Sequence, residues 1–411
     1  GGWRVVVNRR KVVVVGGNFA GLACAMKLSR RYEVTVIDSS PHFEFLPNIH
    51  ELVSGVKTPD LLRLPRARLI RRMGHRFVQD RVTGLDAADG KARTASGQTW
   101  RFDACVVAIG GINNTFGLPG VEQYTLPFKS VDDCAAIGRR LVTLVESGRK
   151  VSVVVVGGGL EGVEALGEIL RRYRREPNLE IHLVETSDSL LPGRPSALGR
   201  DIEHRCQPFA VTFHKGERVE SVTRTGVKLA SGKTLATDLT LWTGGAAPPP
   251  LLADSGLSPT TEGWAPVEPT LQSRFYDNVL VVGDAAELPE PISKQAYHAL
   301  DMGSQAGENV RQLLAGKGLR PFKPGFDVSL ISLGDIDTYL VLGRRVFAGP
   351  ALAPGKELIF QANMERLDPP FGLSPARELQ ARYWQGIHKL TLPSLWPPAR
   401  LANLTELRKL A

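Results

Sequence analysis

Two long runs of β-branched residues set the framework of the chain. Val12–Val15 and Val151–Val156 are apolar stretches of strand length, and the second is interrupted only by a serine. Runs of this kind are typical of strands that are buried on both faces, as in a parallel sheet. Each run ends in a glycine-rich turn, and helix-forming residues follow over 22–28 and 163–172. The pattern therefore predicts an α/β fold that contains the same strand–turn–helix unit twice.

Each unit continues into a second strand that ends in an acid, over Glu33–Asp38 and Glu180–Glu185. In a dinucleotide-binding unit, glycines allow the tight turn, the approach of the pyrophosphate and the close packing of helix on strand, while the acid binds ribose hydroxyls. Two complete units predict two dinucleotide sites. The predicted contacts are Gly16, Asn18, Gly21 and Asp38 in the first unit and Gly157, Gly159, Gly162 and Glu185 in the second.

The two units differ at the middle position of the glycine fingerprint. The second unit has Gly159 there, whereas the first has Asn18. Asparagine tolerates a positive φ better than other non-glycine residues, so we expect the turn to survive. We expect the Asn18 side chain either to push the pyrophosphate outward or to hydrogen-bond to it. Glu185 is followed by Thr186–Asp188, without a lysine or arginine, which favours NAD over NADP.

The composition of the chain limits the partners and the cellular compartment that we expect for it. The 411 residues are enough for two to three domains, and 51 Lys and Arg against 42 Asp and Glu give a net charge of +9. Such an excess favours anionic partners without selecting one. The four cysteines, Cys24, Cys105, Cys134 and Cys206, lack the spacing of a redox pair or a zinc knuckle, so we expect inert thiols, no metal and a cytoplasmic protein. No apolar segment is long enough to span a bilayer, so any membrane contact is expected to be peripheral.

Three further segments, together with the two dinucleotide units, are similar to segments of a known class of proteins. The strand and turn ending in Ala108-Ile109-Gly110, the crossing at Gly244-Gly245 and the Gly283-Asp284 motif together resemble the two-dinucleotide-binding flavoproteins. This resemblance implies an FAD-binding domain in two parts, 1–115 and 246–325, with an NAD(H)-binding domain inserted at 116–245. Residues 326–411 would then form a small C-terminal α+β cap and tail. The implied further cofactor contacts are Ala108, Gly110, Gly245, Gly283 and Asp284.

Within these flavoproteins the chain looks like the type II NADH:quinone oxidoreductases, and more closely like the ferroptosis-suppressor and AIF-like quinone reductases. The residues that carry this resemblance include Gly162-Val163-Glu164 with Glu168, Gly283-Asp284 and Lys294-Gln295-Ala296-Tyr297. Many type II enzymes have two glutamines along the quinone tunnel, and here only Gln295 remains. The resemblance implies FAD, NADH and a quinone-type acceptor, with hydride passing from the nicotinamide to flavin N5.

The same resemblance assigns roles to individual side chains. Lys294 would stabilise negative charge at the flavin, although a solvated lysine at a helix start explains it as well. Glu164 would lie under the nicotinamide or pair with Lys294, although it could equally be an acid favoured by the helix dipole. Gln295, Tyr297 and His298 are candidates for the acceptor pocket, and packing is the alternative for Tyr297 and His298.

Two other segments carry candidate surface functions. Six arginines between Arg63 and Arg76 are predicted to lie on one helix with leucines, either as a solvated face or as a membrane or nucleic-acid contact, but no motif for specific nucleic-acid recognition accompanies them. Ser332–Met364 is predicted to form strands and turns. Beyond Pro369–Pro370 the tail has six Lys or Arg, two acids, Trp384 and Trp396, which is typical of a segment that lies on anionic lipid. Packing on its own body or homodimer formation would also explain this tail.

Three functions are compatible with these residues. The first is an FAD-dependent NADH:quinone oxidoreductase peripheral to a membrane. The second is a soluble NAD(P)H-dependent flavin reductase that serves an iron–sulfur protein or a biosynthetic substrate. The third is an AIF-like binding protein that senses NADH and turns over slowly.

Overall fold

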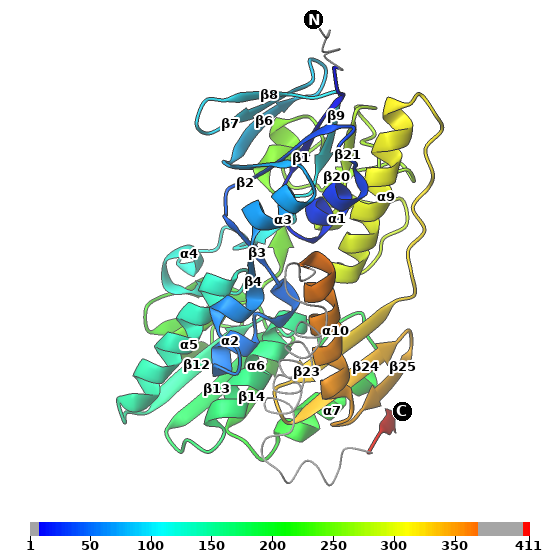
Figure 1. Cartoon of the computed structure of the whole chain (residues 1–411). Helices are drawn as coiled ribbons and strands as arrows, with labels where there is room; N and C mark the ends of the chain where they lie inside the picture. Colours follow the sequence, from blue (N-terminus) through cyan, green and yellow to red (C-terminus); the bar gives the residue numbers. More distant parts are fainter. Residues whose placement is uncertain (1–7, 369–405) are drawn as a thin grey trace, which may run out of the picture. The chain divides into compact units, whose positions relative to one another are not determined.

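The computed structural model describes residues 8–368 and 406–411, which form two compact units (Figure 1). Of the described residues, unit 1 comprises 8–44, 63–112 and 246–326, and unit 2 comprises 45–62, 113–245, 327–368 and 406–411. The chain passes between the units after residues 44, 62, 112, 245 and 326, and two of these crossings lie at β10 (Ile112–Asn113) and β19 (Ala246–Ala247). Two segments therefore group differently from the boundaries expected above. Residues 45–62 belong with unit 2 rather than with the N-terminal part, and the described residues 327–368 and 406–411 join the same unit as 113–245.

Unit 1 is built on a parallel sheet with the strand order β21-β9-β1-β2-β5. The predicted Val12–Val15 run is its central strand, and these four valines are buried because the sheet is covered on both faces. The sheet strands are β1 (Lys11–Val15), β2 (Glu33–Asp38), β5 (Arg76–Gln79), β9 (Ala104–Val107) and β21 (Val279–Val281), and the helices are α1 (Phe19–Lys27), α3 (Arg66–Arg72), α8 (Pro250–Asp254) and α9 (Ala296–Leu314).

Helices α1 and α9 pack together at very short range. A Cβ on Gly303 of α9 would lie 2.1 Å from the carbonyl oxygen of Ala20, so only glycine fits there. An antiparallel meander adds to the opposite face, where Ala92 and Leu85 join the core around Val13. The meander is β6 (Val82–Asp86), β7 (Lys91–Thr94) and β8 (Thr99–Arg101), and the short strand pairs are β3 (His42–Glu44) with β4 (Arg63–Pro65) and β20 (Ala265–Pro266) with β22 (Ala286–Glu287).

Unit 2 repeats the parallel arrangement, with the strand order β11-β18-β12-β13-β14. The Val151–Val156 run is again the central strand. Its sheet consists of β11 (Leu126–Pro127), β12 (Val151–Val156), β13 (Leu179–Glu185), β14 (Val211–Lys215) and β18 (Leu239–Trp242), with a meander of β15 (Val219–Val222), β16 (Gly226–Leu229) and β17 (Thr234–Ala236). Its helices are α2 (Glu51–Ser54), α4 (Val121–Tyr124), α5 (Val131–Glu146), α6 (Leu160–Tyr173) and α7 (Ser196–Cys206), with short 3-10 turns at η1 (Leu46–Asn48) and η2 (Pro59–Leu62).

The C-terminal part of unit 2 corrects one expectation. Strands form as predicted and pair antiparallel, but residues 352–364 are helical rather than strands and turns. Pro354 and Gly355 suggest a break, yet they occupy the first turn of α10 (Leu352–Leu367), where proline costs no internal hydrogen bond. The sheet contains β23 (Val328–Leu333), β24 (Asp337–Leu342), β25 (Arg345–Ala348) and β26 (Arg408–Leu410).

The arginine-rich segment is also not the single helix that was predicted. Arg63 lies in β4, Arg66 begins the seven-residue α3 and Arg76 begins β5, because Pro65 and Gly74 interrupt the helical pattern. Arg66 is buried, so it does not belong to a solvated face.

The described residues contain no helix of the length and apolarity required to cross a bilayer. The predicted lipid-binding or dimer-forming segment falls mainly on 369–405, outside the described residues. All four cysteines are free and buried. Burial raises the pKa of the Cys24 thiol to about 12, which fits the expectation of inert thiols.

Candidate functional site

The first glycine turn follows β1 in unit 1 and has no room for side chains at Gly16 and Gly21. Gly16 has φ +98°, and a Cβ there would lie 2.1 Å from the carbonyl oxygen of Ala108. A Cβ on Gly21 would lie 1.9 Å from the carbonyl oxygen of Gly16. These two residues therefore have the two roles that the fingerprint assigns to its first and third glycines: the tight turn and the close packing of helix on strand.

Asp38 and Arg66 tie this turn to the end of β2. The Gly17 amide donates to Asp38 Oδ2 at 2.8 Å, and Arg66 Nη1 lies 3.0 Å from Asp38 Oδ1. Arg66 Nε donates to the Gly17 carbonyl oxygen at 2.7 Å. Arg66 was not among the predicted site residues. Its position in a run of arginines gave no sign that this one alone is buried beside the turn.

Asn18 fits the turn for a different reason from the one expected. Its φ is −97°, so the backbone needs no tolerance of positive φ. Its side chain bonds to the backbone of Glu44 in both directions: Nδ2 donates to the carbonyl oxygen at 3.3 Å, and Oδ1 accepts from the amide at 3.2 Å. Asn18 therefore fastens the end of β3 to the turn.

The second glycine turn, after β12 in unit 2, repeats the geometry of the first. Gly157 has φ +108°, and a Cβ on Gly162 would lie 1.8 Å from the Gly157 carbonyl oxygen. Glu185 Oε2 accepts from the Gly158 amide at 2.7 Å, the counterpart of the Asp38 contact in unit 1. Gly159, the counterpart of Asn18, has no heavy atom within 4 Å of a Cβ built on it, so this position faces open space.

Both turns lead directly into helix N-termini. Neither Asn18 nor Gly159 caps its helix with a side-chain hydrogen bond, so the first amides of α1 and α6 are not satisfied by these N-cap side chains. Uncapped amides and the helix dipole favour an anion such as a pyrophosphate. The residues of both turns therefore fit a dinucleotide, with the acids Asp38 and Glu185 at the carboxyl ends of the neighbouring strands.

The remaining predicted cofactor contacts also lie at turns after strands. Gly110, Gly245 and Gly283 have φ of +63°, +101° and +70°, conformations that favour glycine. Ala108 follows β9 and forms the wall against Gly16, and Asp284 lies in the 3-10 turn η3 (Gly283–Ala285) after β21. In unit 1, the turns after β1, β9 and β21 thus lie at the carboxyl edge of one parallel sheet, where α/β folds bind their ligands.

Lys294 is held in unit 1 beside one of these turns. Its Nζ donates to the Asp284 carbonyl oxygen at 2.8 Å and lies 3.1 Å from the centre of the Trp264 ring. Partial burial lowers the pKa of Lys294, and the Asp284 carboxylate opposes this shift. Much of the lysine side chain is exposed, as expected for a residue at a helix start, but these two contacts fix its ammonium group beside the turn.

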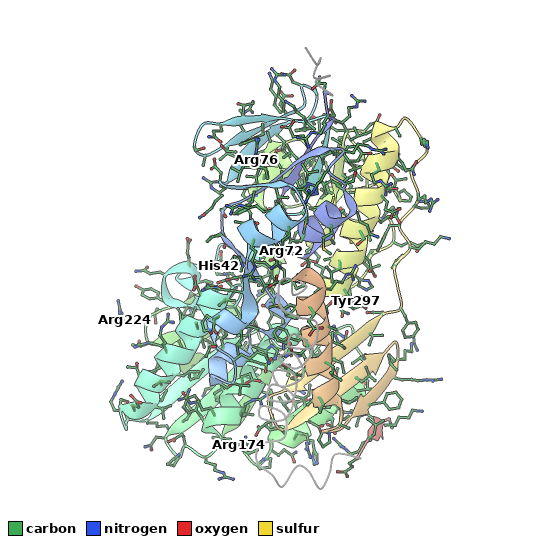
Figure 2. All side chains as sticks on the ribbon, in the orientation of Figure 1. His42, Arg72, Arg76, Arg174, Arg224 and Tyr297 are labelled. Atoms are coloured by element: carbon green, nitrogen blue, oxygen red, sulfur yellow. The ribbon has the colours of Figure 1, made fainter. Side chains whose placement is uncertain are left out.

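The three candidates for the acceptor pocket lie at the start of α9. Gln295 is the N-cap residue, and its Nε2 donates to Ser293 Oγ at 2.9 Å. The Tyr297 hydroxyl donates to the Phe326 carbonyl oxygen at 3.3 Å, and its ring lies 4.1 Å from that of the buried His298. Figure 2 labels Tyr297 at this end of the helix. The structure brings these residues together but leaves their role as a pocket a prediction.

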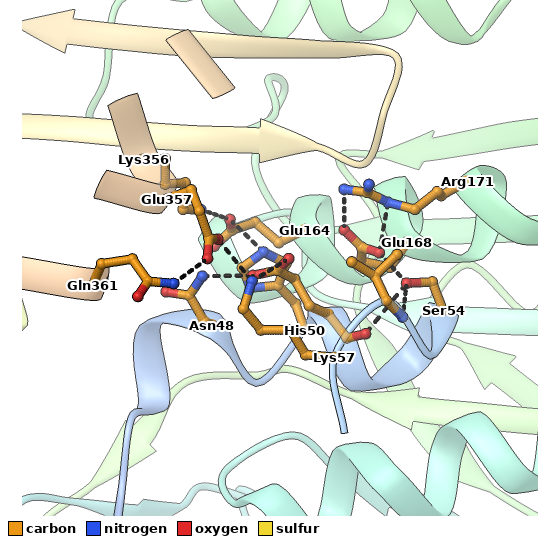
Figure 3. Close-up of polar contacts among 12 residues, drawn as sticks. Asn48, His50, Ser54, Lys57, Glu164, Glu168, Arg171, Lys356, Glu357 and Gln361 are labelled. Carbon is orange, nitrogen blue, oxygen red and sulfur yellow. Dashed lines mark hydrogen bonds and ion pairs between the residues drawn. The ribbon is translucent and has the colours of Figure 1, made fainter. Parts of the chain in front are cut away.

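Glu164 lies in α6 of unit 2, where it is buried and strongly bonded (Figure 3). Its Oε2 accepts from Lys356 Nζ and from the Ser332 amide at 3.3 Å, and lies 3.4 Å from His50 Nε2. Burial raises the pKa of Glu164, while Lys356 opposes this. The carboxylate is thus bonded within its own unit, and its predicted pairing with Lys294 of unit 1 stays a prediction.

Further buried charges surround Glu164, and the sequence analysis did not find them. Lys57 Nζ lies 3.0 Å from Glu51 Oε2 and 2.7 Å from Glu357 Oε2. Burial raises the pKa of Glu51, but Lys57, His50, Arg171 and the Asn48 side chain together outweigh this and lower it to about 2. Arg171 binds Glu168 in the same region, with Nε 2.9 Å from Oε2. The available signal was the short separation of Glu51 and Lys57, which flank the mostly apolar stretch 52–56.

Comparison with known proteins identifies the family of this chain. Residues 10–303 match the pyridine nucleotide-disulphide oxidoreductase family. The chain belongs to this family. The match covers both glycine turns and the Gly283-Asp284 motif, so the predicted α/β fold with two Rossmann-like units is confirmed.

Individual relatives extend over nearly the whole chain. Demethylphylloquinone reductase NdbB of Synechocystis is 25% identical over 372 residues, covering 86% of this chain and 91% of its own length. A type II NADH:quinone oxidoreductase of Staphylococcus aureus is 24% identical over 381 residues, covering 86% and 94%. The predicted resemblance to the type II enzymes is confirmed, whereas a closer relation to the ferroptosis-suppressor or AIF-like group stays a prediction.

Solved structures agree on the fold. NDH2 of Plasmodium falciparum in complex with NADH superposes with a TM-score of 0.80 at 15% identity, covering 95% of this chain and 99% of that one. The sulfide:quinone oxidoreductase of Aquifex aeolicus gives 0.73 at 17% identity, covering 97% and 93%. At these identities the similarity establishes the fold alone, and the reaction has to be inferred from the residues of the site.

Proposed function

We propose that the chain is an FAD-dependent NADH:quinone oxidoreductase. The observation that carries this proposal is the pair of glycine turns with matching geometry, each closed by an acid from the next strand at 2.7–2.8 Å. Two dinucleotide cradles in one chain suit a reaction that passes electrons between two such cofactors. Support for the acceptor comes from relatives of similar length that are named quinone oxidoreductases.

The chain's own residues divide the binding between the units. In unit 1, Gly16, Gly21 and Asp38 would hold FAD, together with the turns at Gly110 and Gly283. In unit 2, the amides after Gly157 would hold the pyrophosphate of NADH, and Glu185 would bind its ribose hydroxyls. When bound, FAD accepts two electrons from NADH and passes them to the quinone.

Two side chains are proposed to act beside the reacting rings. Lys294 is fixed near Asp284 in unit 1, where its charge would stabilise negative charge that develops on the flavin. Glu164 follows the glycine turn in unit 2 and would lie under the nicotinamide. Gln295, Tyr297 and His298 are proposed to line the quinone pocket.

We also propose that the enzyme lies on an anionic membrane surface. The basic, tryptophan-containing composition of 369–411 supports this. Deleting the whole tail would also remove β26, whose Arg408 binds Asp337 at 2.6 Å. A sharper test is Trp384→Ser together with Trp396→Ser, measured by flotation with phosphatidylglycerol vesicles. Loss of flotation supports lipid binding, whereas unchanged flotation, or a dimer that breaks up instead, would contradict it.

Steady-state turnover of the FAD-loaded enzyme tests the proposed reaction. NADH oxidation is measured with ubiquinone, menaquinone and a ferredoxin-type acceptor, each in parallel. We expect fast turnover with a quinone and a higher kcat/KM for NADH than for NADPH, because no cation near Glu185 in the sequence matches a 2′-phosphate. Turnover with the iron–sulfur acceptor alone would favour the soluble reductase, and NADH binding without turnover would favour the sensor.

A further inference from the structure

A hollow lies in unit 1, on one face of the parallel sheet and near its amino edge. It has a volume of about 520 Å³, within the range of small-molecule pockets. Lys11, Glu33 and Arg76 line it, and they are the first residues of β1, β2 and β5. The glycine turn of unit 1 lies at the other end of β1. The hollow is therefore a separate place from the proposed FAD cradle.

The strands bring the lining residues to one face of the sheet. Lys11 is the register partner of Glu33, and Thr35 is the register partner of Arg76. Because side chains alternate along a strand, Lys11, Glu33, Thr35 and Arg76 point to the same side. The meander supplies the other wall, with Lys91 from β7 and Thr99, Trp100 and Arg101 from β8.

The hollow is strongly positive. Four cations, Lys11, Arg76, Lys91 and Arg101, face a single acid, Glu33. Among the described residues, Lys91 alone of the four forms an ion pair, with Asp89 at 2.5 Å. Lys91 and Arg101 are also direct register partners, and the Asp89 carboxylate acts on both, which offsets part of their mutual repulsion. An anion in the hollow would offset the positive charge that remains.

Trp100 gives the hollow an aromatic wall. The Arg76 guanidinium lies 5.5 Å from the centre of its ring, so that cation is held at the wall of the hollow. The indole N–H of Trp100 is enclosed, so the hollow offers a ligand the ring of Trp100 rather than this donor.

We propose that this hollow binds a soluble nucleoside polyphosphate as a regulatory ligand. The cations would hold the phosphates, Glu33 would accept from a ribose hydroxyl, and Trp100 would face the base. A lipid headgroup is the other source of phosphate, but a lipid-facing site has apolar side chains at its rim. None of the strongly exposed apolar side chains of the described residues lines this hollow.

Calorimetric titration of the FAD-loaded enzyme with ATP tests the proposal. Saturating NAD⁺ is present throughout to occupy the glycine turn of unit 2, and adenosine serves as the ligand without phosphates. We expect ATP to bind once per chain, more weakly as salt is raised, and adenosine not to bind. Arg76→Glu with Arg101→Glu should weaken ATP binding at least tenfold, and the milder Arg101→Gln alone should weaken it several-fold.

A control with the same change of charge is Arg274→Glu with Arg311→Glu, two exposed positions of unit 1 that do not line the hollow. We expect it to change ATP affinity less than threefold. The proposal is overturned if ATP gives no saturable binding, if both double variants weaken it equally, or if phosphatidylglycerol vesicles, rather than ATP, respond to the Arg76 and Arg101 changes. The readout is binding, so it is independent of whether a quinone is the acceptor.

Discussion

Gly159→Ala is the substitution that most cleanly separates a dinucleotide site from a merely tight turn. A Cβ at Gly159 meets no heavy atom within 4 Å, and φ −77° with ψ −163° is open to alanine. The folded protein therefore accommodates the methyl group without strain. Its free energy of unfolding should stay within about 0.5 kcal/mol or rise slightly, because alanine restricts the unfolded chain.

The affinity for NADH should fall strongly, because the position that accepts a methyl group in the free protein is the one the ligand needs. If the pyrophosphate approaches this backbone, the methyl group occupies space that the ligand needs. Overpacking of this kind costs about 1–3 kcal/mol. At 1.4 kcal/mol per tenfold change, the affinity for NADH should fall by about 5- to 150-fold. FAD content should not change, because Gly159 lies in unit 2.

The assay combines NAD⁺ titration, the KM for NADH and thermal unfolding of the same preparations. Gly318→Ala is the matched control, because Gly318 is equally open and has no positive φ. Gly162→Ala is the contrasting variant: its Cβ would lie 1.8 Å from a carbonyl oxygen, so it should lower stability even without ligand. Unchanged NADH affinity in a well-folded Gly159→Ala protein would refute the assignment of this turn.

Three further substitutions test other parts of the account. Gly16→Ala should leave the purified protein with several-fold less FAD per chain, measured by visible absorbance, because its Cβ would lie 2.1 Å from a backbone oxygen and φ is +98°. Lys57→Met leaves Glu51 buried without its cation and should cost about 3–5 kcal/mol at pH 7 in urea unfolding. The pKa of Glu51 is lowered to about 2, so the stability that the Glu51–Lys57 pair contributes is complete above the unfolded pKa of Glu51 and is lost as pH falls toward 2. The loss of stability in Lys57→Met should therefore become smaller in acid, and a loss that becomes larger would contradict this reasoning. Lys294→Met should lower the rate of flavin reduction by NADH about tenfold or more with FAD content unchanged, and a wild-type rate in stopped flow would remove Lys294 from the reaction.

The parallel cores could be predicted because their signals are local. The valine runs, the glycines after them and the acids at Asp38 and Glu185 each follow from a short stretch of sequence. The structure places all of them as a dinucleotide fold requires. The conformation of Asn18 was not accessible in this way, since it depends on hydrogen bonds with Glu44, 26 residues further along the chain.

The buried charges could not be found from sequence because their partners are distant. Lys57 meets Glu357 across 300 positions, and Lys356 meets Glu164 across 192. Periodicity cannot distinguish such a lysine from a solvated one until the elements are packed together. Helix α10 was missed for a related reason, because Pro354 and Gly355 read as a break although a first helical turn accepts them.

An anaerobic spectrum of the purified protein tests the central claim most directly. NADH is added to the protein without oxygen, and a quinone is added afterwards, while the flavin absorbance is followed. The account predicts a bound flavin spectrum that bleaches with one equivalent of NADH and returns with one equivalent of quinone. A protein that stays colourless after incubation with FAD, or a bound flavin that NADH does not bleach, would contradict it.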